Sequence, residues 1–255
     1  MSHASKCILR HPCKAAGLDG CNRQCPSYLA IHGLSGVGGR NGAANIPEQY
    51  RLHTLQTSPA REGQPEIYAA LADYVKTFGR QFTVGEARNE PIKSLYLYSR
   101  EPGTGKTTTA AAVANEYIIA HYVGSVQRSR PVIERPAYFV DVNAWQTDYN
   151  AFNRPRVPDE IAEPAAARYY TTQRIAGAAP FVVLDDIGVR DASEAFRADL
   201  HTVINGRVTA GLPTVYTSNL TMDELATLFD RRLADRIRDL TIELTFKGVS
   251  KRGIR

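Results

Sequence analysis

Two kinds of segment are missing from this chain. No run of residues is long and apolar enough to span a membrane. The N-terminal Met-Ser-His-Ala-Ser-Lys-Cys has no apolar stretch of the kind that secretory signal peptides carry. We therefore expect a cytoplasmic protein that does not use a membrane as a partner.

Cysteine is absent from the last 230 of the 255 residues, and all four cysteines lie within the first 25: Cys7, Cys13, Cys21 and Cys25. A disulfide framework needs an oxidising compartment, which the missing signal peptide argues against. Four thiolates at the spacing C-x5-C-x7-C-x3-C suit a tetrahedral structural Zn²⁺ site, with His11 as an alternative to one cysteine. Free structural or redox thiols are the other open interpretation.

A strong charge imbalance is also missing. The net charge of +5 favours a polyanionic partner only weakly, and an ordinary solvated surface explains it equally well. An apolar content of 43% is enough for a real core, and 255 residues fit one large domain, or one domain with a small appendage.

The composition predicts three parts along the chain. Residues 1–32 are too few to build a core without a metal as a staple, and they are predicted to form a zinc-binding, partner-binding module. Residues 33–47 are rich in glycine and are predicted to be a flexible linker. Residues 48–255 are predicted to be the main domain.

The stretch around residue 100 carries the clearest motif. Residues 94–98 suit a strand, Gly103 and Gly105 bend the backbone, and Lys106 and Thr107 open an alanine-rich helical run. Strand, glycine loop, Lys-Thr and helix together are the pattern of a phosphate-binding P-loop. Lys106 is expected to reach the β- and γ-phosphates of ATP, and the Thr107 hydroxyl to bind Mg²⁺. The predicted phosphate cradle consists of Gly103, Thr104, Gly105, Lys106, Thr107 and Thr108.

One position of this motif departs from the usual pattern, because Arg100 stands where a P-loop ordinarily begins with glycine. A surface turn without function is the alternative interpretation. The strand before the loop and the helix after it favour the P-loop.

Two further strands end on polar residues. The apolar run Phe181-Val-Val-Leu ends at Asp185 and Asp186, a pattern expected of a strand buried on both faces. Asp185 is the predicted second Mg²⁺ ligand, and Asp186 the group that orients the attacking water or accepts its proton. Asn219 ends the strand 213–219 and is placed to position water against the γ-phosphate. Plain turns are the alternatives for both sites.

The remaining sequence predicts alternating strands and helices, which is typical of an α/β fold with a parallel sheet. Expected strands are 94–98, 136–143, 181–188, 213–219 and 241–246, and expected helices are 65–79, 191–206 (opened by Asp191), 222–230 and 231–240. The last helix carries Arg232 and Arg236 on one face, since they are four residues apart. An arginine supplied to a neighbouring subunit can neutralise charge in phosphoryl transfer, and this is one interpretation of the two residues. The alternative is that they belong to an ordinary solvated helix face.

The segment 145–177 cannot be assigned to elements from its pattern. It mixes aromatic residues with arginines: Trp145, Tyr149, Phe152, Arg154, Arg156, Arg168, Tyr169, Tyr170 and Arg174. Aromatic rings that stack on bases and arginines that meet phosphates predict contact with single-stranded DNA, for which we single out Tyr149 and Arg156. Aromatic side chains packed into the core are an equally acceptable interpretation.

The order of these motifs resembles the AAA+ helicase loaders of the DnaC/DnaI type and the related IstB-type transposition ATPases. The resemblance covers roughly residues 47–255. It implies an AAA+ sheet of five parallel strands in the order 5-1-4-3-2, with ATP bound between subunits of an oligomer. It further implies Asn219 as sensor 1, Arg236 as the arginine finger with Arg232 as a second candidate, and Arg252 as sensor 2.

The resemblance also implies the function. An ATP-hydrolysing loader would bind a hexameric replicative helicase through the zinc-bearing N-terminal module and place it on single-stranded DNA. The catalytic residues would be Lys106, Asp186, Asn219, Arg236 and Arg252. The alternatives are an IstB-like transposition helper ATPase and a nucleotide-switch adaptor that does not turn over ATP.

Overall fold

The computed structural model describes residues 2–83, 91–188, 192–228 and 231–248. It divides into two compact units, one of residues 1–92 and 111–139, the other of residues 93–110 and 140–255. The boundaries between the units fall neither at residue 32 nor at residue 47. The separate folding of residues 1–32 therefore stays a prediction.

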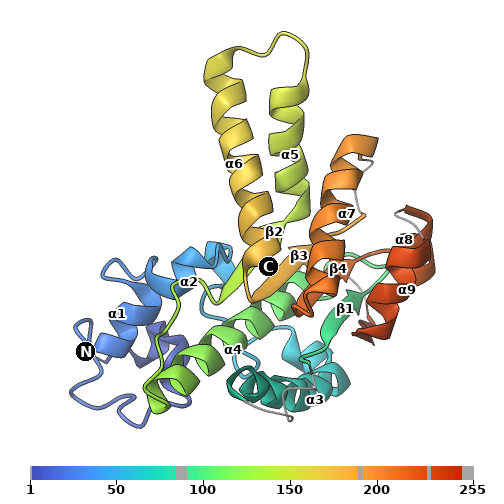
Figure 1. The fold of residues 1–255 in the computed structure, drawn as a ribbon. Helices are drawn as coiled ribbons and strands as arrows, with labels where there is room; N and C mark the ends of the chain where they lie inside the picture. Colours follow the sequence, from blue (N-terminus) through green and yellow to red (C-terminus); the bar gives the residue numbers. More distant parts are fainter. Residues whose placement is uncertain (1, 84–90, 189–191, 229–230, 249–255) are drawn as a thin grey trace. The chain divides into compact units, whose positions relative to one another are not determined.

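Five strands form one sheet in the order β2-β3-β4-β1-β5 (Figure 1). The strands are β1 (Ser94–Tyr98), β2 (Ala137–Asp141), β3 (Phe181–Asp185), β4 (Thr214–Ser218) and β5 (Thr241–Thr245). The pairs β1–β4, β1–β5 and β3–β4 all run parallel. The predicted α/β class and the strand order 5-1-4-3-2 are confirmed.

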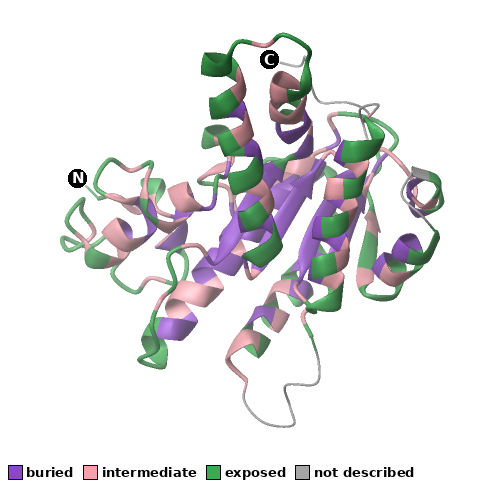
Figure 2. Ribbon diagram, turned by 45° about the horizontal axis from the view of Figure 1, so that its top comes forward, coloured by how far each residue is buried: buried purple, intermediate pink, exposed green. Residues whose placement is uncertain are grey.

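Burial explains why the middle strands read as they do. Every residue of β3 and β4 is buried (Figure 2), and strands covered on both faces need apolar side chains throughout. β1 also differs from the expected alternation, because Leu95, Tyr96 and Leu97 are all fully buried. Tyr96 is compatible with the core because its hydroxyl donates a hydrogen bond to the Leu220 carbonyl at 2.7 Å.

The second unit carries helices α5 (Val142–Asn153), α6 (Asp159–Ala178), α7 (Glu194–Thr209), α8 (Met222–Leu228) and α9 (Arg231–Asp239). Helices α5 and α6 lie side by side and project away from the strands as a hairpin (Figure 1). This hairpin is the segment that the sequence pattern could not assign. Helix α7 begins three residues later than predicted, because the Ser193 side chain caps it by accepting from the Phe196 amide. The predicted opening residue, Asp191, lies outside the described residues.

Aromatic side chains fix the hairpin to α7. Trp145 stacks on Tyr169 with ring centroids 5.2 Å apart and meets Phe196 of α7 edge-on at 5.2 Å. The Tyr169 hydroxyl donates to the Asp199 carboxylate of α7. Tyr149 lies within the same cluster, against Tyr169 at 5.4 Å. The structure thus assigns these rings to packing, the second of the two interpretations.

Arg207 of α7 holds the base of the hairpin. It is fully buried, and its guanidinium donates to the carbonyls of Ala176 and Ala179, to the Pro213 carbonyl and to the Thr214 hydroxyl, each at 2.8 Å. Carbonyls at the end of α6 and just before β4 therefore accept hydrogen bonds from the same side chain. A buried cation is tolerated when its N–H donors are satisfied in this way.

The first unit contains α1 (Pro26–His32), α2 (Gly39–Ala43), α3 (Pro65–Tyr74) and most of α4 (Lys106–Gln127). Residues 33–47, predicted as a linker, include α2. Gly39 has φ +59°, and a Cβ there would lie 2.6 Å from the Ile31 carbonyl group. That glycine therefore serves a close backbone approach. Asn41 is buried and donates to the Asn115 side chain at 2.7 Å.

Two smaller observations complete the fold. The predicted helix 65–79 ends at Tyr74, and a 3₁₀ segment, Val75–Phe82, continues through Gly79, which is therefore not the cap. Within the described ranges, no helix has both the length and the apolar composition needed to cross a membrane.

Candidate nucleotide-binding site

The loop between β1 and α4 has the backbone that its glycines predict. Gly103 and Gly105 have φ values of +74° and +101°, a region that glycine enters without strain. Helix α4 begins at Lys106, so the N–H groups of its first turn face the loop and suit an anion. Arg100 is exposed at the position where glycine is usual.

Lys106 and Asn219 are brought together by the sheet. The Lys106 ammonium is buried and donates to the carbonyls of Ser99 at 3.2 Å and Glu101 at 3.4 Å, and to Asn219 Oδ1 at 2.6 Å. These three oxygens are neutral acceptors, and they orient the ammonium. The predicted lysine and the predicted sensor residue therefore share one site at the carboxyl edge of the sheet, where α/β folds bind ligands.

Asp185 lies beside this site at the end of β3. Its carboxylate is buried and accepts a hydrogen bond from the Thr217 hydroxyl at 2.7 Å. Burial raises the pKa of Asp185 to about 7, the neighbouring charge of Asp186 adds to the rise, and the hydroxyls of Thr217 and Thr107 oppose it. The two predicted Mg²⁺ ligands, Thr107 and Asp185, are therefore close enough for the hydroxyl to affect the pKa of the carboxyl. Oxygen donors of this kind are what Mg²⁺ prefers.

Thr217 is a site residue that the sequence analysis did not single out. Its hydroxyl accepts from the Asp186 amide at 2.8 Å while donating to Asp185. The sequence signal for Thr217 is its position near the end of the predicted strand 213–219. In the structure, Leu184 pairs with Tyr216, so the next residues, Asp185 and Thr217, lie side by side. Asp186 itself has φ +59°, a left-handed conformation that Asp adopts more readily than most residues. Its role toward water stays a prediction.

The pKa of Asp185 predicts a pH dependence of stability. Because a folded-state pKa of about 7 lies above the ordinary value of 3.8, the folded chain holds this proton more tightly than the unfolded chain. The contribution is complete below pH 4 and is lost as the pH rises to about 7. At 1.36 kcal/mol for each unit of pKa, the loss is on the order of 4 kcal/mol.

Urea unfolding between pH 4 and pH 8, in EDTA to exclude Mg²⁺, measures this effect. Asp185→Asn cannot titrate, so the stability difference between wild type and variant should change with pH in the predicted window. Asp148→Asn, at a half-buried carboxyl that pairs with Arg168, is the control. A difference that stays constant from pH 4 to pH 8 would contradict the assignment.

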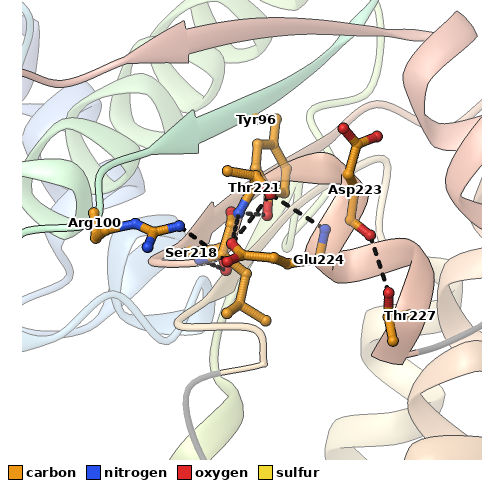
Figure 3. A network of polar contacts seen from close by, with 8 residues as sticks. Tyr96, Arg100, Ser218, Thr221, Asp223, Glu224 and Thr227 are labelled. Carbon is orange, nitrogen blue, oxygen red and sulfur yellow. Dashed lines mark hydrogen bonds and ion pairs between the residues drawn. The ribbon is translucent and has the colours of Figure 1, made fainter.

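The loop that carries Asn219 is held from both sides. The Tyr96 hydroxyl donates to the Leu220 carbonyl, and the Ser218 hydroxyl accepts from the Leu220 amide at 3.0 Å (Figure 3). Because the residues before and after Asn219 are both fixed, its side chain has a defined position opposite Lys106.

Helix α8, which follows this loop, starts with a reciprocal cap. The Thr221 amide donates to the Glu224 carboxylate at 2.7 Å, and the Glu224 amide donates to the Thr221 hydroxyl at 3.2 Å (Figure 3). This is a capping box. Glu224 also pairs with Arg100 at 2.9 Å. The arginine in place of the first P-loop glycine thus links the loop to the helix after Asn219, although so exposed a pair contributes little stability.

The predicted arginines lie on α9. The Arg236 guanidinium donates to Asn205 Oδ1 at 2.6 Å and to the Thr209 hydroxyl at 3.1 Å, both on α7. Arg232 is exposed. No described contact joins either arginine to Lys106. The predicted sensor 2, Arg252, lies outside the described residues.

The four cysteines surround one small cavity in the first unit. Cys7, Cys13, Cys21 and Cys25 all line a space of about 30 Å³ and are half-buried with free thiols. His11 is not among the lining residues. Across the described part of the chain, no three His, Cys, Asp or Glu side chains are arranged to hold a metal ion. The predicted zinc module is therefore not shown.

The sheet order, the glycine loop and the contacts of Lys106 and Asp185 define an α/β fold whose strand–loop–helix has the pattern of a P-loop. No family model matches the chain. Over 173 residues it is 27% identical to the replicative helicase loader DnaI of Bacillus subtilis strain 168, covering 63% of this chain and 48% of the relative. Over 177 residues it is 23% identical to the replicative helicase loader DnaC of Escherichia coli K12, covering 69% and 59%.

The matched segments thus span about half the length of these curated relatives. Among solved structures, the crystal structure of DnaI matches with a TM-score of 0.53 and 21% identity, covering 81% of this chain and 94% of that one. The crystal structure of the DnaC helicase loader matches with 0.53 and 18%, covering 79% and all of that chain. The structural likeness shows the fold, and the sequence similarity confirms the predicted resemblance to DnaC/DnaI-type loaders.

Proposed function

We propose that this chain is an ATP-dependent loader that binds a hexameric replicative helicase and places it on single-stranded DNA. The observation that carries the proposal is the similarity to two replicative helicase loaders. A P-loop site whose lysine, threonine, aspartate and asparagine stand together supports it.

In this proposal the chain's own residues divide the work. Lys106 and the N–H groups at the start of α4 bind the phosphates of ATP, and Thr107 and Asp185 hold Mg²⁺. ATP would supply the phosphoanhydride bond that is hydrolysed, and Mg²⁺ would neutralise part of the negative charge on its phosphates. Asp186 and Asn219 orient the attacking water, and Arg236 meets the phosphate of ATP bound to a second subunit. Arg252 remains a proposed sensor on sequence grounds alone.

The test is capture of the replicative helicase from the same host. The full-length chain, with ATP, is expected to co-purify with the hexameric helicase and to raise its amount on single-stranded DNA. Capture of a transposase on duplex DNA instead would support the IstB-like alternative. Helicase capture that requires ATP, with no ATP turnover with or without single-stranded DNA, would support the switch adaptor.

The α5–α6 hairpin is the proposed DNA-binding element. Its buried rings are committed to packing, and Arg168 pairs with Asp148 at 2.6 Å. Arg154, Arg156 and Tyr170 remain at the surface, Tyr170 with 58% of its area exposed. These residues, rather than Tyr149, are placed to meet phosphates and a base.

Replacing both Arg154 and Arg156 by glutamine should weaken binding to an oligo(dT) strand. Because each phosphate contact to a single strand contributes about 0.7 to the slope of log K against log salt, the slope should fall by about 1.4. Arg130→Gln, an exposed arginine outside the hairpin, should leave it unchanged. Titrations at several salt concentrations measure both slopes, and equal slopes in the two variants would move the DNA contact elsewhere.

The N-terminal cysteines are the proposed zinc ligands. The proposal rests on their spacing along the chain and their common cavity, and bound Zn²⁺ would have to draw the four thiolates together into a tetrahedral site. Basic residues of the same segment, Lys6, Arg10, Lys14 and Arg23, offer charge to the helicase or to DNA. We therefore propose that residues 1–32 determine which protein or nucleic acid the chain binds.

Metal analysis of the purified full-length protein should give about one zinc per chain, and Cys21→Ser should abolish it and lower the melting temperature. The full-length chain is preferable to a truncation near Asn45, because Ile8 and Ile31 are buried within the first unit. Ser27→Ala is a control that leaves all four thiols. A metal-free wild-type protein with the same melting temperature as Cys21→Ser would reject the zinc site.

A further inference from the structure

Arg236 is oriented by neutral groups. Its two terminal nitrogens donate to an amide oxygen, that of Asn205, and to a hydroxyl, that of Thr209. A guanidinium held by a carboxylate would lose most of its field toward a further anion, whereas amide and hydroxyl oxygens fix its direction and leave its charge. Arg236 is therefore both aimed and electrostatically available.

The ion pairs of α9, within the described residues, belong to Arg238. Arg238 pairs with Asp223 of α8 and lies 3.9 Å from Asp235 on its own helix. Asp223 and Asp235 thus lie at Arg238, while Arg232 and Arg236 line a cavity that Arg238 does not line. Among the arginines of α9, Arg238 is therefore paired with carboxylates, whereas Arg236 is held by neutral groups.

A cavity of about 440 Å³ that is open to solvent lies between helices α7 and α9. It is lined by His201, Asn205, Arg232, Leu233 and Arg236. No carboxylate appears among these described lining residues, and neither does any residue of the P-loop. Two guanidinium groups and an amide around one space suit an oxyanion such as a terminal phosphate. Because the chain's own P-loop is not part of the cavity, the phosphate would come from nucleotide bound to a second copy.

We infer that Asn205, supported by Thr209, is the positioning residue for Arg236 in the hydrolysis of ATP bound to a second copy of this chain. The inference rests on the proposed function and deepens it. Asn205 fixes the guanidinium of Arg236 toward the cavity and does so without charge. Arg232, which lines the same cavity, is the second cation and is not held in this way.

Asn205→Asp tests the inference most sharply. The substitution keeps the shape and the acceptor oxygen, so a purely structural contact would be kept or strengthened as an ion pair. If Asn205 must be neutral, single-turnover ATP hydrolysis should fall about tenfold or more, with the melting temperature unchanged or raised. The affinity for a fluorescent ATP analogue should not change, because the variant's own P-loop is intact. Mixing with Lys106→Ala chains, whose Arg236 is intact, should restore part of the hydrolysis.

Asn205→Ala is the companion variant, since it keeps the charge of Arg236 but removes its orientation, and it too should slow hydrolysis without changing nucleotide affinity. Ala195→Asp is the matched control. It adds the same charge at an exposed site of α7, ten residues and about 15 Å along the helix, and should hydrolyse ATP at the wild-type rate.

The outcomes separate the two proposals. A wild-type chain that turns over no ATP, with or without oligo(dT), would overturn the ATPase proposal and this inference with it. An impaired Arg236→Ala beside a fully active Asn205→Asp would overturn the positioning role alone. Loss in Asn205→Asp that mixing with Lys106→Ala chains does not relieve would also overturn it, because the defect would then not act across subunits.

Discussion

Lys106→Ala is expected to abolish stable ATP binding. The substitution removes the one ammonium that the site directs, through Ser99, Glu101 and Asn219, toward the phosphates. A hydrogen bond to a charged group contributes about 1.5–3 kcal/mol, and Lys106 is expected to make more than one to the β- and γ-phosphates. The affinity for ATP should therefore fall by about a hundredfold or more, since 1.4 kcal/mol is tenfold.

Equilibrium binding of a fluorescent ATP analogue measures this loss. Lys76→Ala, at an exposed lysine that pairs with Asp73, is the matched control and should bind like wild type. The melting temperature of Lys106→Ala should be checked, because loss of the lysine ammonium leaves the carbonyl oxygens of Ser99 and Glu101 without this donor. A folded Lys106→Ala protein with unaltered nucleotide affinity would reject the P-loop assignment.

Arg236→Ala is expected to bind ATP normally and to lose nearly all hydrolysis. An arginine that meets the transferring phosphate from a second subunit is worth about 10³–10⁵ in rate, so a loss of at least about a thousandfold is the expected result. Asp186→Asn should also stop turnover, through the attacking water of its own site.

Mixing the two inactive variants checks that Arg236 acts between subunits. In a mixed assembly, an Arg236→Ala chain offers an intact nucleotide site, and an Asp186→Asn neighbour offers an intact arginine. Some hydrolysis should therefore return in single-turnover assays. Arg238→Ala, whose arginine pairs with Asp223, is the control on the same helix. Normal hydrolysis by Arg236→Ala alone would make its role purely structural.

The sequence predicted those parts of the site that depend on order along the chain. The carboxyl ends of parallel strands meet at one edge of a sheet, so a motif after β1, β3 or β4 must come near the others. For this reason Lys106, Asp185 and Asn219 could be named before their contacts were known. Thr217 could have been named by the same reasoning, since it lies on β4 two residues before Asn219, which follows the strand.

The parts that escaped prediction depend on side-chain contacts between distant elements. The aromatic residues of 145–177, read from the sequence alone, are compatible with a base-stacking surface. The packing of Trp145 and Tyr169 against Phe196 shows that these rings belong to the core. The partners of Arg236 are 27 and 31 residues away on another helix, and no local pattern announces such a pair. The close backbone approach at Gly39 likewise could not be foreseen from the glycine content of residues 33–47, and their predicted role as a linker stays a prediction.

The buried Arg207 has a mechanical consequence. Its four bonds clamp the last turn of α6 to the beginning of β4, and releasing the clamp would leave several polar groups unsatisfied inside the protein. We expect a hairpin anchored in this way to act as a lever, because these bonds would resist bending at its base when its outer tip is loaded. The base is joined to the strand that ends beside Asn219, so if the tip binds DNA as proposed, tension on that DNA would reach the proposed nucleotide site.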